Sequence, residues 1–288
     1  MKKFVFTGLL AILVLVTATN HVQAQQAKVA ITLERTACFG ACPIYTVTIL
    51  EDGTVIYKGE KFVAVTGEQT SQIDPAIVKQ MVDAFASAGY FDWKEAYDTM
   101  TVTDMPTIIT SVTRDGKQHR ITRYVGDSSA PLALPYLETW IDVMTNTHLW
   151  TGVASDFSTI STFGESPLLT LQRDACFGMC PVYAIAAYED GKVVYVGIAN
   201  VSKIGVQVFE VDAAAIAHVA QIADLSGYFD WSDSYQKQVI TDQATVTTSV
   251  RGKDQFKHIV RYKGDPNAPI GLVQIEDSID QLIADKVS

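Results

Sequence analysis

An internal duplication constrains this chain more than any other feature. Two near-copies of one short stretch, residues 38–45 and 176–183, contain all 4 cysteines of the 288 residues. The similarity continues beyond them, because residues 35–142 align with residues 173–280 at a constant offset and without a gap. Roughly four aligned positions in ten are identical. The period is too long for a solenoid, so the sequence predicts two similar folded units.

The first half of each copy has the pattern of antiparallel strands. After an expected first strand (28–34 and 168–172), apolar side chains at every second position from 45 to 49 are typical of a half-buried strand. An Asp-Gly pair then follows at 52–53 and at 190–191. It predicts a tight hairpin, because glycine accepts the positive φ that such a turn requires.

The second half of each copy adds helices and another hairpin. In the first copy, Asp74 and Pro75 are typical of a helix N-cap and first helical position, and Gly89 is typical of a helix end. A second hairpin is expected over 107–124, and a closing helix with one apolar face is expected over 134–144. We therefore predict an α+β fold with two similar domains, each an antiparallel sheet with two helices packed on one face. The predicted parts are a signal peptide at 1–24, a first repeat domain at 25–150, a linker at 151–166 and a second repeat domain at 167–288.

The amino terminus has the parts of a secretory signal peptide. Lys2 and Lys3 precede an apolar run, and Ala24 ends a stretch of small residues suited to signal peptidase. The run is short for a bilayer span, so we expect cleavage after Ala24 and no membrane span afterwards. We expect a periplasmic or secreted bacterial protein. Its formal net charge of -10 argues against binding nucleic acid.

The cysteine loops are compatible with three kinds of chemistry. In an exported protein we expect one disulfide in each loop, Cys38–Cys42 and Cys176–Cys180. The C-x-x-x-C-P spacing also resembles the copper-binding loop of Sco-type copper chaperones, so thiol-redox or copper handling in the envelope is the alternative function. A four-cysteine zinc site would require the two loops to meet. We expect disulfides, with no metal and no other cofactor.

A site needed in both copies should appear twice, and this gives a filter for functional residues. The candidates are Asp104, Thr107, Arg123, Asp242, Thr245 and Arg261. They could form a polar ligand pocket with the arginine as an anion clamp. Turn capping by the aspartate and a strand-borne Arg–Asp bridge would explain the same residues without a ligand. The sequence has no Ser-His-Asp order, zinc-protease motif or phosphate loop, so we assign no catalytic residue.

Together, the patterns C-F-G-x-C-P-x-Y, D-G-x-V-x-Y-x-G, a helix ending in G-Y-F, and T-D-x-P-T resemble the 6438 family of domains of unknown function. The resemblance covers nearly all of both copies, and the second copy departs from it at Ala244, where the first has Pro106. It implies small, mostly exported bacterial domains, and the family has no assigned activity or site to carry over. We therefore expect a non-catalytic exported binding or structural module that contacts an unknown protein or envelope ligand.

Overall fold

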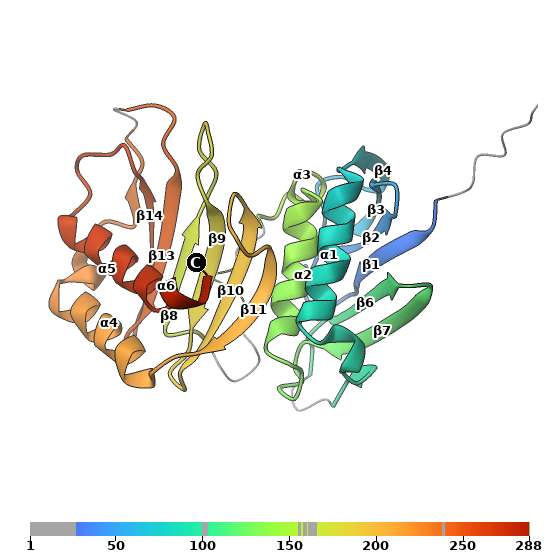
Figure 1. Ribbon diagram of the computed structural model, residues 1–288, viewed down its shortest axis with the longest axis horizontal. Helices are drawn as coiled ribbons and strands as arrows, with labels where there is room; N and C mark the ends of the chain where they lie inside the picture. The colour runs from blue at the N-terminus through green and yellow to red at the C-terminus, as the bar shows by residue number, and fades with distance from the viewer. Residues whose placement is uncertain are drawn as a thin grey trace, which may run out of the picture.

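The computed structural model describes residues 27–99, 103–154, 157, 160, 166–237 and 240–287. The predicted signal peptide lies outside these residues. The described residues form two repeats with the same order of elements, β1 to α3 and β8 to α6 (Figure 1). Each repeat is α+β, with a mostly antiparallel sheet and helices, as predicted.

The first repeat has a seven-stranded sheet of order β4-β3-β2-β1-β6-β7-β5. Neighbouring strands are antiparallel except β5 and β7, which are parallel. The strands are β1 (Val29–Arg35), β2 (Ile44–Leu50), β3 (Thr54–Lys61), β4 (Gly67–Gln72), β5 (Ala96–Tyr97), β6 (Thr107–Arg114) and β7 (Lys117–Tyr124). The helices are α1 (Pro75–Ser87), the 3₁₀ turn η1 (Tyr90–Asp92), α2 (Ala133–Met144) and α3 (His148–Thr151).

The second repeat has the same topology, with a seven-stranded sheet of order β11-β10-β9-β8-β13-β14-β12. Here β12 and β14 form the parallel pair. The strands are β8 (Leu169–Arg173), β9 (Val182–Ala187), β10 (Lys192–Ala199), β11 (Gly205–Glu210), β12 (Ser234–Tyr235), β13 (Thr245–Arg251) and β14 (Phe256–Tyr262). The helices are α4 (Ala213–Leu225), the 3₁₀ turn η3 (Tyr228–Asp230), α5 (Ile270–Gln281) and α6 (Ala284–Val287).

Short polar side chains and glycines determine where these elements begin and end. The Asp74 carboxylate accepts a hydrogen bond from the backbone N–H of Ala76, as expected for the N-cap of α1. Gly89, just after the end of α1, has a φ of 91°. Asp115 and Gly116, between β6 and β7, both have positive φ (50° and 74°), which is the geometry of a type I′ hairpin turn. The predicted helix start and second hairpin are thus confirmed.

The sequence analysis did not predict strand β4 or its counterpart β11. The residues of β4 are mostly polar and lack an apolar alternation, because β4 is an edge strand whose side chains are exposed or half-buried. Backbone pairing to β3 therefore defines this strand. Periodicity of side chains cannot reveal a strand of this kind.

The two repeats stack, with the helices of the first against the sheet of the second (Figure 1). Helices α1 and α2 lie between the two sheets and contact β10 and β11, whereas α4 and α5 cover the other face of the second sheet. The Tyr136 and Tyr188 hydroxyls form a buried hydrogen bond of 2.6 Å across this junction. Phe157, from the segment predicted to be a linker, is buried and stacks parallel to Tyr136 with ring centroids 6.5 Å apart. The result is a four-layer arrangement of sheet, helices, sheet and helices.

The stacking explains a systematic difference between the two copies. On one face of the second sheet, alanine and valine replace polar residues of the first, and these apolar residues are buried against the first repeat. The matched pairs are Thr46 and Ala184, Thr48 and Ala186, and Lys58 and Val196. On the helices the difference is reversed. Tyr136 and Trp140 of α2 are buried in the junction, whereas the matching residues of α5, Gln274 and Ser278, are at least partly exposed.

Candidate functional site

Each repeat presents a short loop that is closed by a disulfide. Cys38 is bonded to Cys42 and Cys176 to Cys180, with Cα–Cα distances of 5.8 and 5.7 Å, so the predicted pairing is confirmed. All four sulfurs are in these two bonds, and no thiolate is available to a metal in this form. The described residues also contain no group of three or more His, Cys, Asp or Glu side chains that could hold a metal ion.

Both loops expose a large apolar side chain at the same position. Phe39 is 87% exposed and Phe177 is 88% exposed. In the second loop Met179 is also 84% exposed. Single exposed apolar side chains are common on protein surfaces, so the informative observation is that the same large aromatic side chain is exposed at matching positions of both loops. Among the described residues, these two phenylalanines are the most exposed large apolar side chains.

A polar triad of arginine, tyrosine and aspartate lies at the base of each loop. In the first repeat, Arg35 Nε and Nη2 donate to Asp142 Oδ2 at 3.1 and 2.7 Å. Tyr45 and Thr147 both donate their hydroxyls to Asp142 Oδ1 at 2.8 Å. The Thr147 hydroxyl, which has one proton, also lies 2.9 Å from the Asp142 backbone oxygen, so it is shared between two acceptors. Asp142 thus joins the strand residues Arg35 and Tyr45 to the segment that follows α2.

The second repeat has the same triad in a more open form. Arg173 Nε and Nη2 donate to Asp280 Oδ2, and the Tyr183 hydroxyl donates to Asp280 Oδ1 at 2.7 Å. Among the described residues nothing takes the place of Thr147, and the Asp280 side chain is 26% exposed compared with 6% for Asp142. Asp280 Oδ1 thus retains an acceptor position that is filled in the first repeat.

The tyrosines of both triads remain hydrogen-bond donors at ordinary pH. Burial raises the pKa of Tyr45 well above its usual value. Burial and the adjacent Asp280 carboxylate likewise raise the pKa of Tyr183. Neither phenol ionises under physiological conditions, so these groups hold the carboxylates in place and do not supply a reactive phenolate.

A cleft borders each triad. The cleft of the first repeat has a volume of about 240 Å³ and is bordered by Pro43, Tyr45 and Asp142, together with Thr151, Val153 and Ile160 from the segment that follows α2. The cleft of the second repeat has a volume of about 290 Å³, and its border includes Pro181, Tyr183, Tyr195 and Asp280. The rest of this border comes from residues 200–202 and from α6. The duplicated candidate site is therefore the exposed loop and the cleft at its base.

The predicted anion clamp is engaged within the protein. Arg123 is buried and donates through Nε to both carboxylate oxygens of Glu138, 3.1 Å from each. Arg261 makes the equivalent buried pair with Glu276. The partner of the strand arginine is thus a glutamate of α2 or α5 instead of the aspartate suggested by the alternative explanation.

The remaining predicted site residues lie near the loops, and their backbone groups bond to residues of or next to the loops. Asp104 has a φ of 77° and its backbone oxygen accepts a hydrogen bond from the N–H of Phe39. The backbone oxygen of Thr107 accepts from the N–H and hydroxyl of Thr36. In the second repeat, Asp242 has a φ of 69°, and the Thr245 oxygen accepts from the N–H of Asp174. These residues support the base of each loop.

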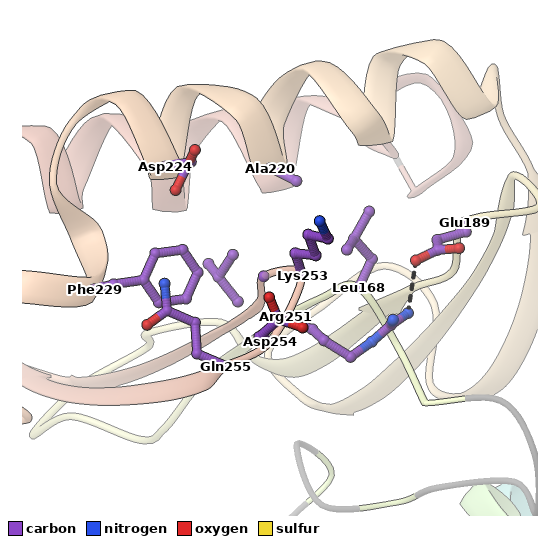
Figure 2. A pocket seen from close by; sticks show the side chains of 11 residues that line it. Leu168, Glu189, Ala220, Asp224, Phe229, Arg251, Lys253, Asp254 and Gln255 are labelled. Atoms are coloured by element: carbon purple, nitrogen blue, oxygen red, sulfur yellow. Dashed lines mark ion pairs between the residues drawn. The ribbon is translucent and has the colours of Figure 1, made fainter.

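A larger hollow occurs in the second repeat (Figure 2). It has a volume of about 670 Å³ and lies between α4 and the β13–β14 turn. Arg251 forms an ion pair of 3.1 Å with Glu189 at its edge. The residue of the first repeat that matches Arg251 is Thr113. The ion pair at its edge is therefore not duplicated, and the charges around the hollow are of both signs.

Comparison with known proteins identifies the family. The model of a domain of unknown function, DUF6438, matches the chain twice, over residues 29–145 and 167–283, and the chain therefore belongs to that family. No curated protein matches the sequence. In the part of the chain that the structure describes, no helix is long and apolar enough to cross a membrane.

Proposed function

We propose that this tandem pair of DUF6438 domains is a non-catalytic exported binding module that contacts its partner through the two disulfide-closed loops. The observation that carries the proposal is the nearly full exposure of Phe39 and Phe177 at matching positions. A covalently closed loop loses little further conformational freedom when it binds, which favours an aromatic anchor at its tip. Large aromatic side chains also dominate the energetics of protein interfaces.

The polar groups next to the loops support binding over catalysis. The carboxylate of Asp142 accepts hydrogen bonds from Arg35 and Tyr45 and lies 2.8 Å from the Thr147 hydroxyl, and the Arg123 guanidinium is paired with Glu138. Side chains saturated in this way hold a backbone in position and are poor proton carriers. Export is supported by the leader-like amino terminus and by the disulfides, which persist in oxidising compartments.

Site-specific photo-cross-linking tests the proposal. A photoreactive phenylalanine analogue is placed at Phe39, at Phe177 or, as a matched control, at Leu225, which is 79% exposed at the end of α4. In the producing cells, both loop positions should give one shared adduct that Leu225 does not give. Replacing both phenylalanines by serine should weaken partner binding about tenfold or more, because each is expected to act as an anchor. The same adducts from all three positions, or none from the loops, would contradict the proposal.

Thiol titration separates this function from the thiol-redox or copper-handling alternative. If the loops are structural, protein from outside the cytoplasm should contain no free thiol and should resist mild reductant. Ready reduction of both pairs, or copper that copurifies with them, would favour the alternative.

A further inference from the structure

The hollow beside α4 has the usual make-up of a small-molecule site, an apolar wall with a few charged groups. Its volume of about 670 Å³ lies within the range of about 300–1,000 Å³ that ligand pockets span. The apolar wall consists of Leu168, Ala220, Phe229 and Val250. The charged side chains at the border are Glu189, Asp224, Arg251, Lys253 and Asp254.

Two of these charges neutralise each other. Arg251 and Glu189 form the ion pair of 3.1 Å at the edge of the hollow. Arg251 also donates to the backbone oxygens of Ser166 and Pro167, at 3.0 and 3.3 Å. Arg251 therefore ties the start of β8 to β13, and its ion pair adds no net charge to the hollow.

Three charged side chains at the border have no hydrogen bond or ion pair in the part of the chain that the structure describes: Asp224, Lys253 and Asp254. The Lys253 side chain extends from the β13–β14 turn toward α4, the helix that carries Ala220 and Asp224 (Figure 2). Residues four apart on a helix are neighbours, with about 5–6 Å between their Cβ atoms. An ammonium group thus approaches the stretch of helix that carries the Asp224 carboxylate.

The first repeat has neither charge at the matching positions. The residue that matches Asp224 is Ala86, and the residue that matches Lys253 is Asp115. The shared fold therefore forms without this ammonium and this carboxylate, which leaves both groups available to a ligand.

The ring of Phe229 adds an aromatic surface next to these charges. In the first repeat, the His119 ring lies beside the matching Phe91, with ring centroids 6.3 Å apart. In the second, the only ring contact of Phe229 among the described residues is with Tyr228, at 5.7 Å, and Phe229 borders the hollow. An aromatic face of this kind can contact an apolar group or a cation.

We propose that the hollow of the second repeat binds a free α-amino acid with an apolar side chain. Its ammonium pairs with Asp224, its carboxylate pairs with Lys253, and its side chain lies on the apolar wall beside Phe229. An anion alone would be repelled by Asp224 and Asp254, and an amine alone would be repelled by Lys253, so the charges favour a zwitterion. The two charges of an α-amino acid are attached to one carbon atom, which suits groups that approach neighbouring turns of one helix.

This site is separate from the disulfide-closed loops. The N–H of Asp174, just before the second loop, is bonded to the backbone oxygen of Thr245, the first residue of β13. The hollow lies at the other end of this seven-residue strand, about 20 Å away. The amino-acid site and the proposed loop contacts can therefore be tested independently.

Isothermal titration calorimetry of the full chain tests the proposal with free L-phenylalanine as the probe. We expect saturable binding. Two blocked forms separate the two charges, because N-acetyl-phenylalanine lacks the ammonium and phenylalanine amide lacks the carboxylate. Each blocked form should bind about tenfold or more weakly, since each loses a hydrogen bond between charged groups.

Two substitutions that introduce the residues of the first repeat locate the site. Asp224→Ala and Lys253→Asp should each weaken binding of L-phenylalanine about tenfold or more. Both variants should fold, because both side chains are exposed and the first repeat folds with the matching residues. Asp285→Ala is the matched control, because this carboxylate is exposed and lies outside the border of the hollow, and it should bind as the wild type does.

Three results would overturn the proposal. They are no saturable binding at millimolar L-phenylalanine, equal binding of either blocked form, and binding that Asp224→Ala and Lys253→Asp leave unchanged. Because no residue of the disulfide-closed loops borders the hollow, such a failure would leave the cross-linking result unaffected.

Discussion

A matched pair of glycine substitutions tests the stacking of the two repeats. Gly205 begins β11 and has a φ of 97°, and an added Cβ would lie 2.3 Å from the Cβ of Ala84 on α1. Gly67 occupies the matching position in β4 and has a φ of 84°, but an added Cβ there would meet nothing within 4 Å. The two positions share their backbone conformation and differ in whether another repeat covers them.

The expected losses of stability follow from this difference. An alanine held at positive φ costs about 1–2 kcal/mol, and this is the expected loss for Gly67→Ala. Gly205→Ala has the same backbone cost. It also forces Ala84 and its helix to move, and overpacking of this kind typically costs a further 1–3 kcal/mol. We therefore predict a loss of about 2–5 kcal/mol for Gly205→Ala.

Urea denaturation followed by circular dichroism measures both losses. Hydrogen exchange gives a second readout, because Gly205→Ala should accelerate exchange in α1 and β11, whereas Gly67→Ala should affect β3 and β4 only. Equal destabilisation by the two variants, with unchanged exchange in α1, would show that α1 and β11 do not pack closely in solution. In that case the four-layer arrangement would be wrong.

Three further predictions concern the interior, the loops and the pH dependence of stability. Glu138→Gln leaves the buried charge of Arg123 without its counterion and should cost about 3–5 kcal/mol in urea denaturation, whereas replacing both residues by apolar ones should cost less. Reducing the two disulfides should lower stability by only about 2 kcal/mol each, because each closes a very short ring, and circular dichroism should still show a folded chain. Hydrogen bonds from the N–H groups of Asn267 and Lys237 lower the pKa of Asp265, so its contribution to stability is present above about pH 4, the unfolded value, and is lost as the pH falls through the lower folded value. Thermal melting from pH 6 to 2 should therefore show a smaller acid-induced loss for Asp265→Asn than for the wild type.

Local rules predicted the parts of the fold that depend on a few neighbouring residues. The N-cap at Asp74, the hairpin turn at Asp115-Gly116 and both disulfides follow from chemistry confined to a short stretch of chain. Strand β4 was missed because its identity comes from pairing with β3 and leaves no pattern in its own side chains. An element could thus be predicted when neighbouring residues define it, and could not be predicted when residues distant in the sequence define it.

The residues of the triads are among the positions that are identical in the two copies. Arg35, Tyr45 and Asp142 are identical in both copies, as is Glu138. Arg35 and Asp142 lie at opposite ends of the aligned region, 107 residues apart, so nothing in the local pattern joins them. Identity between the copies selects such residues, whereas only the fold shows which of them meet.

The stacking required the opposite comparison. Selecting identical positions leaves out those at which the copies differ, and such positions form the junction. Thr48 and Lys58 of the first copy are polar, whereas the matching Ala186 and Val196 of the second copy are apolar and buried. Residues 182–187 are a continuous apolar run, so apolar side chains lie on both faces of this strand. Such a run indicates a sheet that is covered on both sides. The differences between duplicated sequences therefore carry information on assembly that their similarities cannot supply.

The junction between the repeats also constrains the proposed binding through both loops. The junction joins two different surfaces, because the helices of the first repeat pack on the sheet of the second. A contact between unlike surfaces does not close on itself, so its geometry allows a third unit to be added. The two outer faces have polar residues where the junction has apolar ones. These are Thr46 and Thr48 on the first sheet and Gln274 and Ser278 on α5. Polar outer faces of this kind keep stacked repeats soluble. Because the junction is packed, the two loops keep a constant separation. In the proposed binding mode, a partner that engages both loops must match that spacing, and the packed junction would set the gain from two-point binding.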